Sequence, residues 1–392
     1  MSDFTSYVDA AAGLTDDMVE LRRDIHAHPE LALDNPRTQG QIVEALTGLG
    51  YEISLGEGCT SVVADLTGGD GPTVLLRADT DALPMTEDTD EDFTSRVEGR
   101  AHACGHDAHT AMLLGAARLL AENRSELPGS IRLMFQPGEE GAHGAKVMID
   151  EGVLDGVDRA FALHVPPNIP AGLVAARPGP MLARADEFRL TVTGRGGHAS
   201  TPHFCTDPVP AACATVTALH TQLTREIEAF NPAVLTVAQI EAGTTTNVIP
   251  ESAMVAGTIR AVSEASRLKT QQLVERVATN TAAAHGCSCD VRITPGYPVT
   301  VNHADQVALF EGVAEATLGT GHYVELPTPV MGAEDFSYVL NDRPGLMAFL
   351  GVCPDDIENS FEAPPNHSNR MRLNESAMPT GAALHVAMAL TA

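Results

Sequence analysis

The 392-residue chain has no tryptophan, only two lysines (Lys146 and Lys269) and no apolar run long enough to cross a membrane. A membrane-spanning helix needs about 20 mostly apolar residues, so we expect no membrane partner. The 52 acidic residues outnumber the 24 basic ones and give a formal net charge of -28. So negative a surface repels phosphate backbones, which argues against nucleic-acid binding.

The chain also lacks a cysteine pattern. Its seven cysteines are scattered, and the close pair Cys287 and Cys289 has neither the zinc-knuckle nor the redox C-x-x-C spacing. The first residues, MSDFTSYVDAAAGLTDD, have neither the basic start nor the apolar stretch of a signal peptide. We therefore expect a reduced, cytoplasmic protein.

Short apolar segments alternate with helical ones in the first half of the chain. The pattern predicts strands at 73–79, 130–136 and 159–166, and a helix at 109–123, where apolar residues recur at three- and four-residue steps. Strands separated by helices indicate an α/β fold with a central, mainly parallel sheet flanked by helices.

The pattern changes after residue 181. It becomes a β-α-β-β-α series, with strands at 187–196, 233–243 and 252–262 and helices before 228 and around 264–285. This predicts a smaller α+β domain inserted into the larger one, and the length of the chain also favours two domains. We expect the larger domain to comprise residues 1–181 and 295–392, and the inserted domain to comprise residues 182–294.

Eight residues, HACGHDAH at 102–109, gather three histidines, one cysteine and one aspartate. Cys104 and His106 stand two residues apart before the predicted helix, in what we interpret as a loop, so both side chains can reach one metal ion. The simpler interpretation of His102 and His109 is that they are polar surface or helix-capping residues.

Acids and histidines also follow the predicted apolar strands, where sites form in α/β sheets. They are Asp79, Asp81, Glu139, Glu140 and His164. Burying an unpaired charge costs several kcal/mol, and a shared cation would offset that cost. Adjacent Glu139 and Glu140 also suit metal-assisted hydrolysis, in which one carboxylate holds metal and the other takes a proton from water. A solvated acidic turn is the alternative for this pair.

These motifs occur in an order that resembles a known group of enzymes. The segments are LRRDIHAHPEL, RADTDALP, HACGHDAHTAMLLGAA, FQPGEEGAHGAKVMI, LHV, GRGGHASTPH, TNVIP and NHS. Together they resemble the metal-dependent amidohydrolases, which include hippurate hydrolases, N-acyl-amino-acid deacylases and auxin-conjugate hydrolases, within the aminoacylase and carboxypeptidase metallopeptidase family. The likeness runs over nearly the whole chain.

The resemblance implies two divalent metal ions per subunit. The ligands it implies are Cys104, His106, Glu140, His164 and His367. It makes Glu139 the general base and gives Asp107 and His109 supporting positions. The carboxypeptidases have a histidine where this chain has Asp79, two residues before Asp81, so we expect Asp81 to be supporting or catalytic rather than a ligand. Thiolate with imidazole favours zinc, while manganese, cobalt and nickel are also compatible.

The resemblance also implies that the inserted domain is a lid, which commonly forms a dimer interface, so we expect a homodimer or dimer-based oligomer. His198 would reach the substrate carbonyl, often in the neighbouring subunit, and stabilise the oxyanion. Asn247 and Arg260 would bind the substrate carboxylate. Without the resemblance, His198 fits a surface residue and Arg260 a solvated strand residue.

The expected function is hydrolysis of N-acyl amino acids to a carboxylic acid and a free amino acid. A dipeptidase or carboxypeptidase with the same metal site is the nearest alternative. A non-catalytic metal-binding protein is a third, which Glu139 argues against because a binding site needs no second carboxylate beside Glu140. The sequence leaves open the acyl group, the amino acid, the metal used in the cell and whether the acidic surface reflects a saline habitat.

Overall fold

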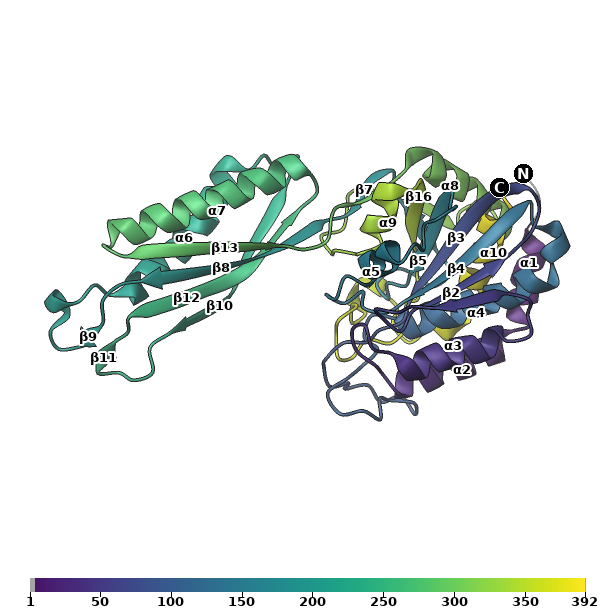
Figure 1. Ribbon diagram of the computed structural model, residues 1–392, viewed down its shortest axis with the longest axis horizontal. Coiled ribbons are helices and arrows are strands. Elements are labelled where there is room, and N and C mark those ends of the chain that lie inside the picture. Colours follow the sequence, from purple (N-terminus) through teal and green to yellow (C-terminus); the bar gives the residue numbers. More distant parts are fainter. Residues whose placement is uncertain (1–3, 392) are drawn as a thin grey trace. The chain divides into compact units, whose positions relative to one another are not determined.

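The computed structural model describes residues 4–391. The chain forms two compact units (Figure 1). The first takes in the chain up to Met181, Val301–Thr328 and the residues from Asp335 onward, and the second comprises Leu182–Thr300 and Pro329–Glu334. The second unit thus continues past residue 294, where the sequence analysis ends the inserted domain, and it includes a short later segment.

The first unit contains both helices and strands. The strands are β1 Glu52–Leu55, β2 Val62–Leu66, β3 Gly71–Asp79, β4 Gly129–Gln136, β5 Arg159–His164, β6 Val174–Ala176, β7 Gly179–Leu182, β14 Thr300–Asn302, β15 Tyr323–Glu325 and β16 Gly345–Leu350. The helices are α1 Thr5–Ala12, α2 Thr15–Ala27, α3 Pro36–Leu46, α4 His106–Glu122, α5 Gly144–Asp150, α8 Ala304–Leu318, α9 Ser337–Asp342 and α10 Met378–Leu390, with 3-10 turns at Arg124–Glu126, Ser360–Glu362 and Glu375–Ala377.

An eight-stranded sheet forms the centre of this unit, in the order β1-β2-β4-β3-β5-β16-β6-β15. The middle strands β4, β3, β5 and β16 run parallel, which confirms the predicted mainly parallel α/β sheet flanked by helices. The register pairs Asp79 with Gln136 and His164 with Phe349. The carboxyl ends of these strands therefore meet at one edge, where sites form in such sheets.

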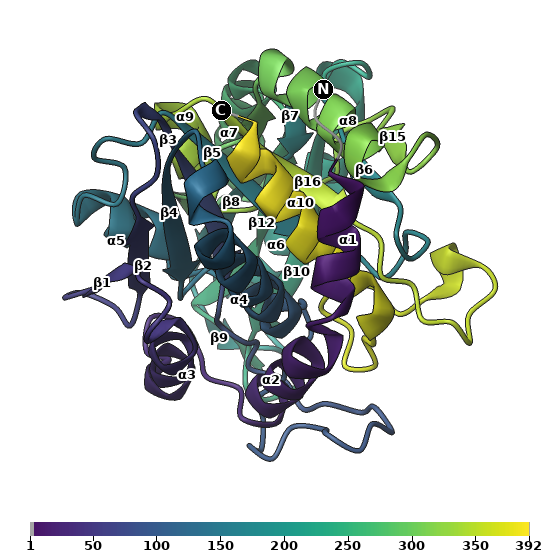
Figure 2. The ribbon, with the colours of Figure 1, turned by 90° about the vertical axis from the view of Figure 1, so that its right-hand side faces the viewer.

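Helices cover both faces of the sheet. Helices α4 and α10 pack together on one face, and α5 and α9 lie on the other (Figure 2). Nearly every residue of α4 is buried, including polar residues of its first turn. Its partners in the core include Leu76, Phe161 and Leu384. None of the helices in the described part of the chain is long and apolar enough to cross a membrane.

The second unit is a four-stranded antiparallel sheet with two helices. Its elements are β8 Arg184–Thr193, β9 Gly197–His198, a 3-10 turn at Pro202–Phe204, α6 Pro208–Glu226, β10 Ala233–Ala242, β11 Val248–Ile249, β12 Ser252–Ala261, α7 Glu264–Ala284 and β13 Ser288–Pro295. The sheet order is β10-β12-β8-β13. Apolar residues of the sheet, such as Leu190 and Val255, pack with Leu219 of α6 and Val274 of α7.

Strand β13 is absent from the predicted β-α-β-β-α series. Its apolar residues Cys289, Val291 and Ile293 alternate with polar ones and pack against the core of this unit. This period of two is the pattern of a half-buried strand. Ending the series after the helix was therefore wrong.

Candidate metal centre

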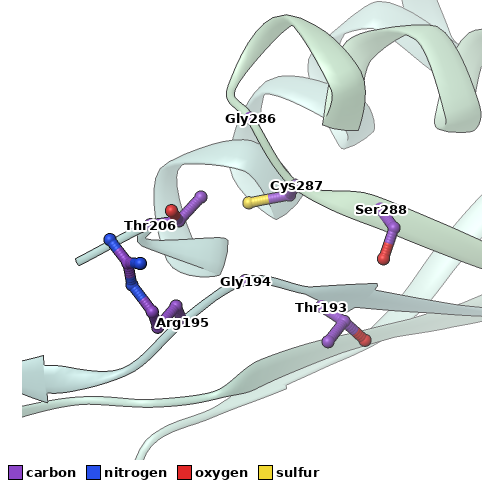
Figure 3. A pocket seen from close by; sticks show the side chains of 7 residues that line it. All are labelled: Thr193, Gly194, Arg195, Thr206, Gly286, Cys287 and Ser288. Atoms are coloured by element: carbon purple, nitrogen blue, oxygen red, sulfur yellow. The ribbon is translucent and has the colours of Figure 1, made fainter.

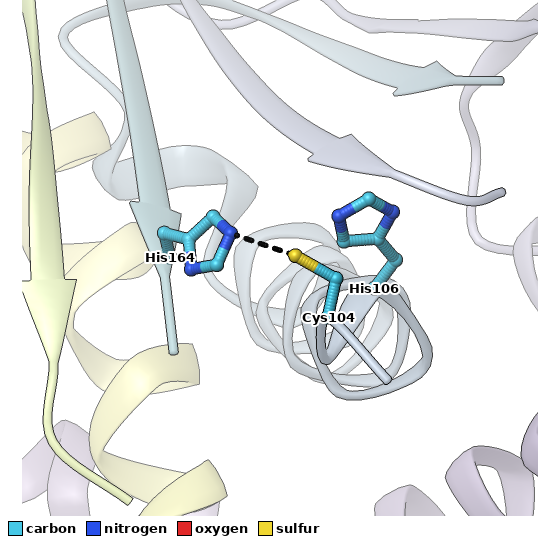
Figure 4. Close-up of side chains that lie close together, drawn as sticks. All are labelled: Cys104, His106 and His164. Carbon is cyan, nitrogen blue, oxygen red and sulfur yellow. Dashed lines mark hydrogen bonds between the residues drawn. The ribbon is translucent and has the colours of Figure 1, made fainter. Parts of the chain in front are cut away.

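Three predicted ligands meet where β5 ends and α4 begins. The thiol of Cys104 lies 3.4 Å from Nε2 of His164, and Figure 4 shows it between the rings of His164 and His106. One potential ligand atom from each of these residues lies within 4.8 Å of the others. Backbone segments far apart in the sequence thus bring a thiol and two imidazoles to one point.

Glu140 and His367 complete the predicted ligand set. Cys104, Glu140 and His367 form a second group with ligand atoms within 4.8 Å of one another, and His106 joins Glu139 and Glu140 in a third. Nε2 of His367 lies 3.0 Å from Oε1 of Glu140. The five predicted ligands therefore fall into overlapping groups, as a site for two ions requires.

Two ring nitrogens of the centre have no protein partner among the residues that the structure describes. Nε2 of His106 and Nδ1 of His164 are buried there without a hydrogen bond. Buried polar atoms are nearly always satisfied, so unsatisfied ones need an explanation. Thiolate, imidazole and carboxylate are ligands of divalent transition metals, which fit these positions.

The electrostatics of the centre favour a cation. Burial lowers the pKa of His106, but the negative charges of Asp79 and Cys104 outweigh burial and hold that pKa well above its ordinary value. Hydrogen bonds to Cys104 and Glu140 raise the pKa of His367 to about 10. The surroundings that attract a proton to these rings also attract a metal ion.

Special backbone conformations at Gly105 and His367 help to present predicted ligands. Gly105, between Cys104 and His106, has φ of +92°, and a Cβ atom there would lie 2.3 Å from Cγ2 of Val165. Only glycine fits both conditions. His367 adopts φ of +68°, an unusual conformation for a residue with a side chain. Its N–H donates to the carbonyl of Ala103 at 2.7 Å.

The carboxylate of Asp81 accepts hydrogen bonds from the backbone of both glutamates. Its Oδ1 accepts the N–H of Glu139 at 2.9 Å, and its Oδ2 accepts the N–H of Glu140 at 3.0 Å. Its backbone carbonyl lies 2.8 Å from Nδ1 of His106. Both carboxylate oxygens are therefore used in fixing the turn that carries the glutamates, which is a positioning role.

His109 is not a surface residue, so that interpretation was wrong. It is 2% exposed, its Nδ1 lies 2.5 Å from Oδ1 of Asp79, and its Nε2 accepts the N–H of Val165 at 3.0 Å. Because Nε2 accepts, Nδ1 carries the proton that it donates to Asp79. Both ring nitrogens of His109 are therefore engaged by protein groups, which fits a supporting position better than that of a ligand.

The buried charge of Asp79 is balanced by protein groups. Nη1 of Arg77 donates to its Oδ2 at 2.6 Å. Burial raises the pKa of Asp79, but the charges of Arg77 and His106 outweigh it and hold the pKa well below its ordinary value. The shared cation expected for this strand end is therefore not what stabilises Asp79.

Sequence reasoning missed Asn366, Arg77, Gln136 and Asp335, which help to build the centre. Asn366 donates to the carbonyls of Cys104 at 2.9 Å and Val165 at 3.2 Å. Fully buried Arg77 and Asp335 form a network with Gln136 beneath the site, in which Gln136 donates to Asp335 at 2.7 Å. An arginine inside the apolar run TVLLRAD was a signal of this network, because buried charges need partners.

The surface interpretation of His102 was also wrong. The residue is 2% exposed, and neither ring nitrogen has a hydrogen-bond partner among residues 4–391. Burial lowers its pKa to about 3, so the ring is neutral at neutral pH. It occupies the interior because the segment before α4 runs through the core.

The other predicted site residues lie in the second unit. His198 pairs with Val248 between β9 and β11, and the carbonyl of Asn247 accepts the N–H of Ala199 at 3.1 Å. His198 and Asn247 are thus neighbours, and both are exposed. Arg260 lies near the other end of β12. The part of β12 from Ser252 to Arg260 spans about 27 Å at the usual rise per residue of a strand.

The second unit also contains a polar pocket of about 380 Å³. Arg195, Thr206 and Cys287 are among the residues that line it (Figure 3). The pocket lies at the base of the 195–206 loop, which the mutual hydrogen bonds of Arg195 and Thr206 close. None of the predicted catalytic, substrate-binding or metal-binding residues lines it.

Comparisons with known proteins agree with this chemistry. Residues 75–391 match the model of peptidase family M20/M25/M40. The chain is 41% identical over 377 residues to IAA-amino acid hydrolase ILR1-like 2 of Arabidopsis thaliana, over 95% of this chain and 84% of that protein. It is 39% identical over 382 residues to thermostable carboxypeptidase 2 of Saccharolobus solfataricus, over 96% and 95% of the two chains.

A solved structure is similar over the whole length. The YXEP protein of Bacillus subtilis, described as a dinuclear metal-binding peptidase, superimposes with a TM-score of 0.83 at 31% identity. The match covers 97% of this chain and 98% of that one.

Proposed function

Because the chain belongs to peptidase family M20/M25/M40 and is a metal-dependent hydrolase of amide or peptide bonds, we propose that it cleaves N-acyl amino acids. The products are a carboxylic acid and a free amino acid. The observation that carries the proposal is the grouping of buried Glu139 with His106 and Glu140. The Arabidopsis relative, named as an IAA-amino acid hydrolase, supports this substrate class.

Two divalent ions per subunit would be held by the five ligands Cys104, His106, Glu140, His164 and His367. When bound, such ions polarise a carbonyl and lower the pKa of water. The thiol and imidazoles favour zinc, and manganese, cobalt or nickel could replace it. The ring nitrogens of His106 and His164 that lack a partner among the described residues support this assignment.

Glu139 is the proposed general base. Its backbone N–H is fixed by Asp81 at 2.9 Å, and the residue is 6% exposed. The carboxylate would take the proton of the attacking water and then deliver it to the leaving nitrogen. Asp81 fixes the backbone of this base, which is why we now assign it to positioning within the catalytic set.

His198, Asn247 and Arg260 are proposed to bind the substrate. His198 would donate a hydrogen bond to the developing oxyanion, and Asn247 and Arg260 would bind the carboxylate. Arg260 is partly buried and forms no ion pair with a residue that the structure describes, which suits an anionic ligand. Because about 27 Å of strand separates its end of β12 from the His198 end, one subunit has difficulty bringing all three to one small substrate.

This separation supports a homodimer, in which His198 and Asn247 act in the site of the partner subunit while Arg260 acts in its own. We propose that the second unit is the lid and dimerisation domain, through which each subunit supplies His198 and Asn247 to the site of its partner. All seven cysteines are free, which supports the proposed cytoplasmic location.

The experiment for this proposal is a substrate panel. Metal-loaded protein is incubated with N-acetyl, N-benzoyl, long-chain acyl and indoleacetyl amino acids, and release of the amino acid is measured. Dipeptides with a free amino group form the second arm, because the Saccharolobus relative is named a carboxypeptidase. Release from N-acyl substrates supports the proposal, whereas cleavage of dipeptides alone would assign the protein as a dipeptidase.

A further inference from the structure

His26 lies in the motif LRRDIHAHPEL and has no role in the function proposed above. Its ring is buried, with 4% of the side chain exposed, between two carboxylates. Nδ1 lies 2.8 Å from Oδ2 of Asp107, and Nε2 lies 3.1 Å from Oε1 of Glu87. An ionised carboxylate only accepts hydrogen bonds, so both ring nitrogens must donate. The ring that fits this geometry is the imidazolium cation.

The surrounding charges require the same protonation state. Arg22, on the same helix, donates to Asp107 at 2.9 Å and to Glu375 at 2.6 Å. Arg23 also pairs with Glu375. With His26 charged, three cations therefore face three anions: Arg22, Arg23 and His26 against Glu87, Asp107 and Glu375. A neutral His26 would leave one mostly buried negative charge unpaired, which is costly.

The two carboxylates belong to different parts of the site. Asp107 follows the ligand His106 in the first turn of α4. Glu87 lies in the 84–100 loop, which begins after Leu83 and returns at Ala101, where these two residues form an antiparallel bridge. The loop thus starts just after Asp81 and ends just before Cys104. His26 joins this loop to the helix that presents a ligand.

The same loop contacts the segment that carries His367. Asp88 donates its N–H to the carbonyl of Asn369 at 2.7 Å, and Nε of Arg370 donates to Oδ2 of Asp88 at 2.8 Å. Glu87 also accepts the N–H of Ser95 at 2.7 Å, which shapes the loop from within. The left-handed conformation of His367 persists only where its surroundings hold it, and this loop is part of those surroundings.

We propose that His26 is a positioning residue that acts as a cation, fixing the 84–100 loop and its neighbour His367 against the first turn of α4. This inference rests on the proposed function, because it concerns the geometry of the same site. Below the raised pKa of His26, both hydrogen bonds form. As the pH rises through that pKa, the ring loses one donor, and the loop loses its bond to the helix.

The groups facing His26 set the direction of this dependence. Burial lowers the pKa of His26, and Arg22 opposes the proton as well, but Asp107 and Glu87 outweigh both and keep the pKa above its ordinary value. His102 faces the ring at 6.2 Å between centroids and is neutral at neutral pH. Both hydrogen bonds of the His26 ring are therefore fully formed below about pH 6.5, which is the ordinary pKa of histidine. One of them is lost only at higher pH.

Two measurements on the full-length, metal-loaded protein test the proposal without substrate. Nitrogen NMR of labelled histidines should show both ring nitrogens of His26 protonated at neutral pH. Hydrogen exchange of the 84–100 amides, divided by the intrinsic rate at each pH, should be slow in the wild type and rise at alkaline pH. In His26→Gln the exchange should be about tenfold faster or more, the size expected when a buried hydrogen bond to a charged partner is lost.

Two further variants make the test specific. His28→Gln is the matched control, because His28 lies in the same motif, is partly exposed and bonds to the carbonyl of Asp24. It should match the wild type in loop exchange and in the pH profile of kcat/KM. Glu87→Gln removes one anion facing His26. The midpoints of the pH profiles of loop hydrogen exchange and of kcat/KM should therefore move down by about one to three pH units.

A neutral His26 ring at neutral pH would overturn the proposal, as would wild-type loop protection in His26→Gln. If His26→Gln does not fold, Glu87→Gln decides, and an unchanged midpoint counts against the proposal. A wild type that hydrolyses no N-acyl amino acid would refute the proposed function alone, because the NMR and exchange measurements need no substrate.

Discussion

Replacing Asp81 with asparagine tests the positioning role of this residue, because the change keeps the size of the side chain and removes one acceptor. In the wild type each carboxylate oxygen accepts one backbone N–H, from Glu139 and from Glu140. Asparagine keeps one acceptor oxygen and turns an NH₂ group toward the other N–H. We expect a less stable protein with a displaced general base.

The size of the effect follows from these two bonds. A hydrogen bond to a charged group contributes about 1.5–3 kcal/mol, and a neutral one about 0.5–1.5 kcal/mol. Losing one bond and the charge on the other should lower the free energy of unfolding by about 2–4 kcal/mol. A displacement of about 1 Å at a reacting group can lower the rate about 10²-fold, so kcat should fall by that order.

Three quantities are measured on Asp81→Asn: the free energy of unfolding in urea, the metal content and kcat. The control is Asp158→Asn, because exposed Asp158 also accepts one backbone N–H, from Thr73 at 2.8 Å, away from the site. A surface change of this kind should alter stability by only about 0.5 kcal/mol. Wild-type stability and kcat in Asp81→Asn would refute the positioning role.

Three further predictions concern the ligands, the dimer and acid stability. Cys104→Ser should lower metal content and activity, measured by metal analysis, whereas Cys353→Ser, at another buried cysteine, should change neither; full metal in Cys104→Ser would remove Cys104 from the ligand set. Mixing inactive His198→Ala with inactive Glu139→Gln subunits should restore activity, and no rescue after demonstrated subunit exchange would contradict action across the dimer. Burial raises the pKa of Asp107, but the charges of Arg22 and His26 outweigh burial and hold that pKa below its ordinary value. The stabilisation by Asp107 is therefore present above about pH 4 and is lost as the pH falls further. Urea unfolding should show this loss of stability, and an equal loss in Asp107→Asn would contradict the assignment.

The sequence predicted the central strands because their apolar runs are short and end at turn residues. The segment 130–136 stops before Pro137-Gly138, and β4 ends at Gln136. The start of α4 was predicted three residues late, at 109. The helix begins at His106 because Gly105 adopts the left-handed conformation that precedes it.

The predicted ligand set came from the resemblance to a known family, and the fold brings potential ligand atoms of these residues close together. The supporting residues were harder to predict. Nothing in the local sequence distinguishes His109 from a surface histidine. Only its hydrogen bonds with Val165 and Asp79 in the folded structure show that both ring nitrogens are engaged. Asn366 acts through contacts with Cys104 and Val165, which are distant in the sequence. Such contacts depend on tertiary structure and leave no local pattern.

The central claim is that Glu139 acts as the base of a metal-dependent N-acyl-amino-acid hydrolase. The most direct test compares wild type and Glu139→Gln, with metal content and amino-acid release from N-acyl substrates measured on the same samples. The account predicts two ions per subunit in both proteins, release by the wild type, and turnover lower by about 10²–10⁴-fold in the variant. Equal turnover in the two proteins at equal metal content would contradict it.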